Sequence, residues 1–247
     1  MIKLICFIRK RAELDIPAFQ NHWRENHGPL IRSLPKLRRH LIRYEQNHRL
    51  AEDYARDEAS GAGQGTETGA YDGSTIMWFP SMEAYHAFAA EPDYAEHIAP
   101  DEARFMDRAK TLFFFTDEED IKLGDADRQA QAGVKLLALL RRRSDLTPEA
   151  FHAHWTGPHA ALFTETPALR DHILAYQQNH RFPADYERDP ETHWDGLAEQ
   201  WYASLEKFYA GAGGGPFEEI VAPDEERFID RPATQFILSH PPEIIVS

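Results

Sequence analysis

His27 and His159 are the two residues of this sequence best suited to acid–base chemistry. An imidazole titrates near neutral pH, so it can take up a proton and return it. Phe19 and Trp23 stand eight and four residues before His27, so the three side chains share one face of an expected helix, close to a helix break that could open onto a cavity. We expect at least one of the two histidines to move protons. The alternative is a histidine that only caps the end of its own helix.

Two short rows of polar side chains could bind and polarise a substrate. Residues that alternate along a strand point to the same side, so each row would present a phenol, an amide and an imidazole together. Such a row could orient a phenolic or carbonyl substrate and stabilise an enolate. The alternative is that the same groups satisfy buried backbone atoms at a strand end. The rows are Tyr44, Gln46 and His48 in the first half of the chain, and Tyr176, Gln178 and His180 in the second.

A further group of candidates surrounds Trp78 and Trp201, which are expected in the core or in a cavity wall. Glu199 and Gln200 precede Trp201, and one of them should face inward because neighbouring strand residues point to opposite sides. A carboxylate in an apolar cavity would have a raised pKa and could act as a base. Alternatively, Glu199 faces solvent. Met77 occupies the place of Gln200 in the first half of the chain, which predicts that the two half-sites are not equivalent.

Two further histidines and two acidic pairs fit structural roles. His22 and His154 stand five residues before the two catalytic candidates, which corresponds to about 140° around an α-helix, so we do not expect them to share a site. The same spacing disfavours a metal site, because helical metal ligands prefer positions i and i+4. Two acidic pairs follow a proline at the expected start of a short helix, where they would stabilise the helix dipole. They are Asp101-Glu102 and Asp224-Glu225.

The elements that must position these residues are encoded twice. Ile2-Lys3-Leu4 recurs 132 residues later as Val134-Lys135-Leu136. From Asp72-Gly73 onward the distance is 123 residues, so the second copy is nine residues shorter in the intervening loop. Such colinearity predicts two similar units. We expect residues 1–117 and 134–242 to form them, joined by an acidic linker at 118–133.

Each copy follows the order βαββαβ. Apolar runs predict the strands, Asp15, Thr147, Ser81 and Ser204 are expected helix N-caps, and Gly28-Pro29 is expected to disrupt the first helix near its end. This order is that of a ferredoxin-like antiparallel sheet with helices on one face, so the expected fold class is α+β. Two such units can press their bare sheet faces together and close a pseudo-two-fold α/β barrel around a cavity. The expected strands are residues 2–8, 40–48, 75–79, 110–115, 134–140, 198–202 and 234–238.

Composition restricts the partners. The 247 residues carry a formal charge of −14, so the chain as a whole lacks the basic footprint that nucleic-acid binding requires. Its single cysteine, Cys6, cannot form an internal disulfide, and no apolar stretch is long enough to span a membrane. We therefore expect a cytoplasmic protein whose partner is a small-molecule substrate, with association into a homodimer as an open alternative.

The repeated motifs resemble those of the EthD family of dimeric α/β barrels. The first copy carries His22-Trp23-x-x-x-His27-Gly28-Pro29-Leu30, then Pro35 and Tyr44-x-Gln46-Asn47-His48. The second copy carries His154-Trp155-x-x-x-His159-Ala160-Ala161-Leu162, then Pro167 and Tyr176-x-Gln178-Asn179-His180. The resemblance covers nearly the whole chain as a tandem fusion of two EthD-like units.

The resemblance implies small-molecule chemistry on acid–base side chains that line the barrel, generally without a cofactor. Relatives include muconolactone isomerases and decarboxylases or cyclases of polyketide-derived aromatics. The isomerases place a histidine and a tyrosine where this chain has His27 and Tyr44, and His159 and Tyr176. Their cysteine before the third-strand tryptophan is absent here.

We therefore expect a cofactor-independent lyase, isomerase or cyclase that acts on a small aromatic, lactone or polyketide-like molecule. Two alternatives remain open. The first is a non-catalytic module that binds hydrophobic small molecules or serves in a stress response. The second is a cofactor-free monooxygenase, because related barrels oxidise activated phenols through a substrate carbanion.

Overall fold

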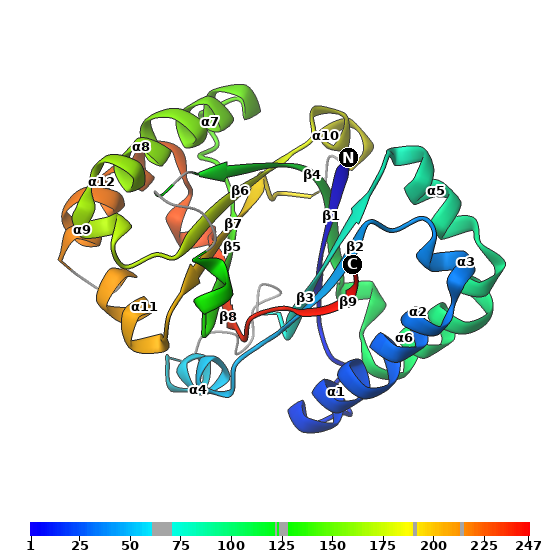
Figure 1. Ribbon diagram of the computed structural model, residues 1–247. Coiled ribbons are helices and arrows are strands. Elements are labelled where there is room, and N and C mark those ends of the chain that lie inside the picture. Colours follow the sequence, from blue (N-terminus) through cyan, green and yellow to red (C-terminus); the bar gives the residue numbers. More distant parts are fainter. Residues whose placement is uncertain (61–70, 122, 124–127, 190–191, 213–214) are drawn as a thin grey trace. The chain divides into compact units, whose positions relative to one another are not determined.

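The computed structural model describes residues 1–60, 71–121, 123, 128–189, 192–212 and 215–247, and it divides the chain into two compact units (Figure 1). Unit 1 comprises Met1–Thr116 and Pro242–Ser247, and unit 2 comprises Asp117–Pro241. These boundaries differ from the expected 1–117, 118–133 and 134–242. Residues 118–121 continue a strand instead of forming a linker, and the C-terminal segment supplies an edge strand to unit 1.

Unit 1 is an antiparallel sheet with the strand order β4-β1-β3-β2-β9, and most of its helices cover one face, whereas α4 lies apart from them (Figure 1). In β1, Leu4 and Ile8 face the helices while Ile5 and Phe7 face the other way, and all four are buried. The strands are β1 (Ile2–Ile8), β2 (Arg43–His48), β3 (Gly73–Phe79), β4 (Leu112–Ile121) and β9 (Glu243–Val246). The helices are α1 (Ile16–His22), η1 (Trp23–His27), α2 (Gly28–Ser33), α3 (Pro35–Arg38), α4 (Ala51–Ser60), α5 (Met82–Ala90), η2 (Tyr94–Ile98), α6 (Ala99–Phe105) and η3 (Arg108–Lys110).

Unit 2 repeats this arrangement with the strand order β8-β5-β7-β6. The part of β4 that belongs to unit 2, residues 117–121, lies beside β6. The strands are β5 (Val134–Leu140), β6 (Ala175–Arg181), β7 (Gly196–Tyr202) and β8 (Gln235–Ser239). The helices are η4 (Gln129–Gln131), α7 (Pro148–His154), η5 (Trp155–His159), α8 (Ala160–Glu165), α9 (Pro167–Arg170), α10 (Pro183–Arg188), α11 (Leu205–Ala212), η6 (Phe217–Val221), α12 (Ala222–Phe228) and η7 (Arg231–Ala233). The predicted α+β class with two ferredoxin-like units is confirmed.

The predicted N-caps are also confirmed. The Asp15 carboxylate accepts a hydrogen bond from the Ala18 N–H at 2.7 Å, and the Thr147 hydroxyl accepts from the Ala150 N–H at 3.3 Å. Ser81 and Ser204 accept equivalent bonds at 3.2 Å at the starts of α5 and α11. Each cap satisfies a backbone donor that has no partner within its own helix.

The first helix of each unit is disrupted near its Gly-Pro pair (Gly28-Pro29 and Gly157-Pro158), as predicted, but it does not end there. In unit 1 it passes through the π-helical turn η1, where the Gly28 N–H bonds to the Trp23 carbonyl, and then continues as α2. In unit 2 the Ala160 N–H bonds likewise to the Trp155 carbonyl. A π-turn accommodates one extra residue and shifts the hydrogen-bond register, which lets a proline without an N–H lie inside the helix.

The repeated Asp-Gly pairs explain how these helices approach the sheet. A Cβ atom at Gly73 would lie 2.5 Å from the Trp23 ring, and one at Gly196 would lie 2.5 Å from the Trp155 ring. Only glycine leaves room for the indole over the start of β3 and of β7. The tryptophan is thereby held against the sheet, and the histidine four residues later is held with it.

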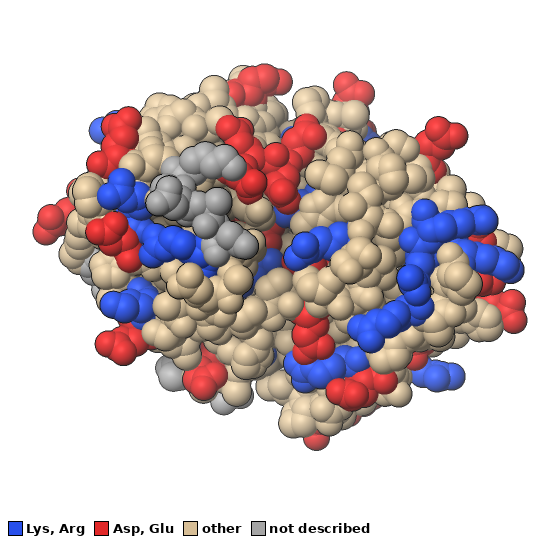
Figure 2. Space-filling model, in the orientation of Figure 1, with Lys and Arg blue, Asp and Glu red and all other residues tan. Residues whose placement is uncertain are grey.

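Charge on the molecular surface is mixed. Acidic and basic side chains are interspersed on the face shown in Figure 2. Within the described residues, every helix is too short or too polar to cross a membrane.

Candidate functional site

Each unit has a cavity, partly open to solvent, between its sheet and its helices. The unit 1 cavity has a volume of about 340 Å³ and the unit 2 cavity about 310 Å³. His27 and Tyr44 line the first, and His159 and Tyr176 line the second. The structure therefore brings each predicted histidine together with its predicted tyrosine. These cavities lie within the units, whereas the sequence predicted a cavity between two sheet faces.

In unit 2, one carboxylate holds two histidines. Asp224, from α12, lies 2.9 Å from Nδ1 of His159 and 2.9 Å from Nε2 of His154. Burial raises the pKa of Asp224, but the hydrogen bonds from His159 and His154 outweigh it and bring that pKa below its ordinary value. An ionised Asp224 only accepts hydrogen bonds, so Nδ1 of His159 carries a proton and donates it.

This arrangement leaves Nε2 of His159 as the basic atom. Burial lowers the pKa of His159, although Asp224 opposes this shift, so the imidazole is neutral at neutral pH. Among the described residues, Nε2 has no hydrogen-bond partner. A neutral imidazole with its Nδ1 proton fixed by a carboxylate is the arrangement of a general base.

Unit 1 contains the same arrangement of two histidines bound to one aspartate. Asp101 lies 2.9 Å from Nδ1 of His27 and 2.9 Å from Nε2 of His22. Burial raises the pKa of Asp101, and the hydrogen bonds from His27 and His22 outweigh this effect, so the pKa lies below its ordinary value. His27 is only 5% exposed, and Phe105 packs against its ring.

The shared carboxylates correct two predictions. We predicted that His22 and His27 point in different directions and that Asp101 only stabilises a helix start. The prediction assumed an α-helix, whereas the i→i+5 hydrogen bonding of η1 places residues five apart on one face. The Ala-Pro-Asp-Glu sequence, present in both copies, was the available signal, and residues 99–102 and 222–225 carry it.

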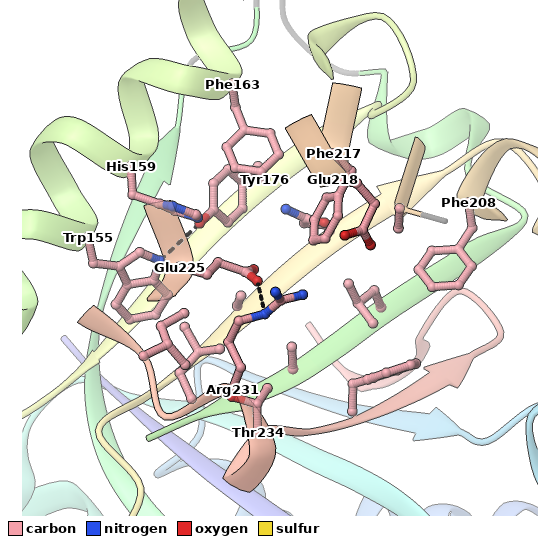
Figure 3. A pocket seen from close by; sticks show the side chains of 18 residues that line it. Trp155, His159, Phe163, Tyr176, Phe208, Phe217, Glu218, Glu225, Arg231 and Thr234 are labelled. Carbon is pink, nitrogen blue, oxygen red and sulfur yellow. Dashed lines mark hydrogen bonds and ion pairs between the residues drawn. The ribbon is translucent and has the colours of Figure 1, made fainter. Parts of the chain in front are cut away.

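The phenol of Tyr176 is held by two donors. Its oxygen accepts a hydrogen bond from Nε1 of Trp155 at 2.9 Å (Figure 3). It accepts a second from Nε2 of Gln178 at 3.1 Å. In unit 1, Nε2 of Gln46 donates to Tyr44 at 3.3 Å. Burial raises the pKa of Tyr44 to about 12 and raises the pKa of Tyr176 as well, so both phenols keep their protons at neutral pH.

A second carboxyl group lines each cavity. In unit 2, Oε2 of Glu225 lies 3.0 Å from Nε of Arg231, and the two side chains point toward each other in Figure 3. Burial raises the pKa of Glu225 to about 7 despite Arg231. In unit 1, Glu102 accepts a hydrogen bond from the Tyr94 hydroxyl at 2.9 Å, and burial raises the Glu102 pKa despite nearby His27. The sequence prediction missed these carboxyl groups as site residues.

The other residues of the two polar rows lie behind the tyrosines. Gln178 is fully buried, and its Nε2 also bonds to the Trp155 carbonyl at 2.9 Å, while its Oε1 lies 3.1 Å from Nε2 of His180. Gln46 makes the corresponding bonds to the Trp23 carbonyl and to His48. These four residues are absent from the cavity walls, so their contacts fit the positioning of Tyr44 and Tyr176 better than direct substrate contact. They are Gln46, His48, Gln178 and His180.

The third strand separates its candidates by face. Gln200 lines the unit 2 cavity, whereas Glu199 lies on the opposite side of β7, where it pairs with Nζ of Lys135 at 2.5 Å. Trp201 lies there too, with its ring 4.7 Å from the Lys135 ammonium, and Trp78 lies 4.7 Å from Nζ of Lys3 in unit 1. The expectation that Glu199, Trp78 and Trp201 reach the substrate therefore does not fit these cavities, because strand alternation turns them away.

In the described part of the chain, no group of three or more His, Cys, Asp or Glu side chains could hold a metal ion.

Fold and site together define a tandem α+β protein with a His–Asp–Tyr constellation in each half. The family model of the EthD domain matches residues 11–109 and 143–232, so the chain belongs to the EthD domain family. No curated protein sequence matches this chain.

Solved structures share the fold at low sequence identity. An anthrone oxidase-like protein has a TM-score of 0.65 and 8% identity, with 100% of this chain and 93% of that chain covered. A proposed monooxygenase of Fusobacterium nucleatum has a TM-score of 0.55 and 7% identity over 98% and 93% of the two chains. A chlorite dismutase variant of Candidatus Nitrospira defluvii has a TM-score of 0.52 and 9% identity over 97% and 91%.

Proposed function

We propose that this protein is a cofactor-independent acid–base enzyme that removes a proton from a small aromatic, lactone or polyketide-like substrate. The observation that carries the proposal is the His159–Asp224 pair, which leaves an unprotonated Nε2 on a buried histidine in the wall of the unit 2 cavity. His27 and Asp101 provide the same groups in unit 1. The base and the hydrogen-bond donors are all side chains, so the proposed step requires no bound cofactor.

The cavity supports a small, mostly apolar substrate. Its volume of about 310 Å³ is roughly twice that of an engineered cavity that binds benzene, so one or two fused rings would fit. Phe163, Phe208 and Phe217 contribute aromatic walls (Figure 3). Such walls favour a planar ring.

The chemistry divides among three groups. His159 takes the proton, the neutral phenol of Tyr176 hydrogen-bonds to the oxygen on which negative charge develops, and Glu225 can return a proton because its pKa is about 7. Return of the proton to another carbon gives an isomerase. Loss of a leaving group or closure of a ring gives a lyase or a cyclase.

A second candidate is a cofactor-free monooxygenase. It is favoured by the solved structures of similar fold that are called monooxygenase and anthrone oxidase-like. The first step would be the same deprotonation. The carbanion would then reduce O₂, and a methylene group would become a carbonyl with release of one water.

The test follows proton removal directly. The chain is incubated in D₂O with a panel of anthrones, naphthols and unsaturated lactones, and loss of C–H signals is measured by NMR. We expect exchange with the wild type and a rate roughly 10²–10⁴-fold lower when both histidines are replaced, in H27A/H159A. An unchanged rate in this variant would contradict the proposal.

Two further readings separate the candidates. Oxygen consumption that accompanies exchange identifies the monooxygenase. Binding of the panel without exchange or oxygen consumption by the wild type identifies a non-catalytic binding module.

A further inference from the structure

Tyr176 and Gln200 stand side by side in the unit 2 cavity. They are direct cross-strand partners on β6 and β7, and both line the cavity. The Cβ atoms of such partners lie about 5 Å apart on the same face of a sheet. Their polar groups can therefore meet at a single atom of a ligand.

The Tyr176 hydroxyl retains its own proton for a ligand. Its oxygen already accepts two hydrogen bonds, from Trp155 and Gln178. Within the described residues, no group accepts a hydrogen bond from this hydroxyl. A buried O–H without a protein acceptor is a donor that a ligand oxygen can satisfy.

The Gln200 amide is oriented in the same way. The Tyr202 hydroxyl donates to Oε1 of Gln200 at 2.6 Å, so the amide presents its NH₂ group to the cavity. In the part of the chain that the structure describes, this NH₂ group has no acceptor. Two oriented donors, one phenol and one amide, are thus without protein acceptors in one small cavity.

Unit 1 lacks this pair although its fold is the same. The cross-strand partner of Tyr44 is Met77, which has no donor, and Phe79 occupies the position equivalent to Tyr202. Thr75, at the position of Ala198, also lines the unit 1 cavity. The two cavities therefore differ in the groups that they offer to a ligand oxygen.

We propose that Tyr176 and Gln200 together bind one anionic or strongly polarised ligand oxygen (an enolate, phenolate or carbonyl oxygen) and that the unit 1 cavity lacks this function. Gln200 is then a specificity-determining residue, and Tyr202 is a positioning residue that acts through it. The inference rests on the proposed function only in the choice of substrate class.

The first test uses 4-nitrophenol, whose ionised form is measured by its visible absorbance, and nitrobenzene as a probe of the same shape without the hydroxyl group. We expect the wild type to bind one equivalent of 4-nitrophenolate per chain, and Q200M to bind it roughly 10- to 100-fold more weakly, since a hydrogen bond to a charged oxygen is lost. Nitrobenzene should bind both proteins equally. Unchanged nitrophenolate binding by Q200M, or equal weakening of both probes, would overturn the proposal.

The role of Tyr202 is tested by a double-mutant cycle. Y202F should weaken nitrophenolate binding less than Q200M, and Q200M/Y202F should be no weaker than Q200M alone. Independent, additive losses would show that Tyr202 does not act through Gln200.

A gain-of-function variant supplies the complement. M77Q/F79Y places the unit 2 pair in unit 1, and we expect a second equivalent of nitrophenolate to bind. Absence of the second equivalent would contradict the assignment of the difference to these positions. H27A/H159A should retain nitrophenolate binding at Tyr176 and Gln200 while it loses proton exchange, so a failure of the proposed function is distinguishable from a failure of this inference.

Discussion

At the scale of single residues, Asp224 decides which nitrogen of His159 can act as a base. It accepts hydrogen bonds from two imidazoles, and this fixes the His159 proton on Nδ1. Sequence patterns identified His159 and Tyr176, because their residue types and spacing are visible along the chain. They did not identify Asp224 as the partner of His159, because the repeated acids at 222–225 also fit a helix start and no local pattern links them to a residue 65 positions away.

Replacing Asp224 with asparagine should disrupt this tautomer. The asparagine amide can donate to Nδ1 and thereby favour the proton on Nε2, so we expect proton exchange in unit 2 to fall roughly 10²–10⁴-fold. The rate is measured in an H27A background, which isolates unit 2, and imidazole ¹⁵N NMR shows which nitrogen is protonated. A fast rate with the Nε2–H tautomer would contradict the role of Asp224.

Glu225 should give the protein a pH-dependent stability. Its pKa is raised from 4.5 to about 7, mainly by burial, so between these values the folded state binds more protons than the unfolded state. The free energy of unfolding therefore falls as the pH rises through this window. In E225Q this part of the fall should disappear, which is about 3 kcal/mol for a shift of this size.

The measurement is urea unfolding of wild type and E225Q at about pH 5 and about pH 8. E226Q is the matched control, because the neighbouring Glu226 side chain is 72% exposed. Equal pH dependence in wild type and E225Q would show that Glu225 ionises normally.

At the scale of elements, the π-helical turns explain why part of the site was predictable and part was not. The caps, the strands and the shared face of Trp23 and His27 follow from local patterns. His22 and His27 both reach Asp101 because the hydrogen bond in η1 joins residues five apart, one more than in an α-helix. Sequence periodicity assumes a regular α-helix, so it placed these histidines about 140° apart.

The helix also depends on the glycine beneath its tryptophan. A Cβ atom at residue 196 would lie 2.5 Å from the Trp155 ring and 2.6 Å from the Asn179 carbonyl oxygen. We expect G196A to lower the free energy of unfolding by roughly 1–3 kcal/mol, because a rigid indole and a strand backbone must move apart. Thermal unfolding followed by circular dichroism measures the effect.

G157A is the matched control, because Gly157 lies in η5, the π-turn that begins at Trp155. No atom lies within 4 Å of a Cβ at Gly157, so this change should be neutral or raise stability by about 0.4–1 kcal/mol. If G196A proved as stable as G157A, the close contact with Trp155 would not limit this position.

At the scale of the whole molecule, the repeat predicted two ferredoxin-like units but not their exact boundaries. The chain enters unit 2 at Asp117 and returns to unit 1 at Pro242. A repeat shows which segments are equivalent, yet it does not show which edge strand each segment pairs with. The predicted closure of the two sheets into a barrel stays a prediction.

The return of the chain at Pro242 predicts that unit 1 depends on the last residues of the sequence. Ile245 is 6% exposed on β9, and its Cδ1 lies 2.9 Å from the position of a Cβ at Gly28, at the start of α2. We expect I245S to lower the free energy of unfolding by roughly 2–5 kcal/mol, since it removes a buried aliphatic side chain and buries a hydroxyl group. Hydrogen exchange of β2 and α2 should accelerate, while that of β5 and β7 in unit 2 should change little.

I244S provides the control on the same strand. Ile244 is 39% exposed, so its replacement should change stability by no more than about 0.5 kcal/mol. Equal effects of I244S and I245S would mean that β9 contributes only its backbone pairing with β2. Faster exchange throughout both units in I245S would mean that they unfold as one cooperative body, and the C-terminal strand would then support the entire tandem fold.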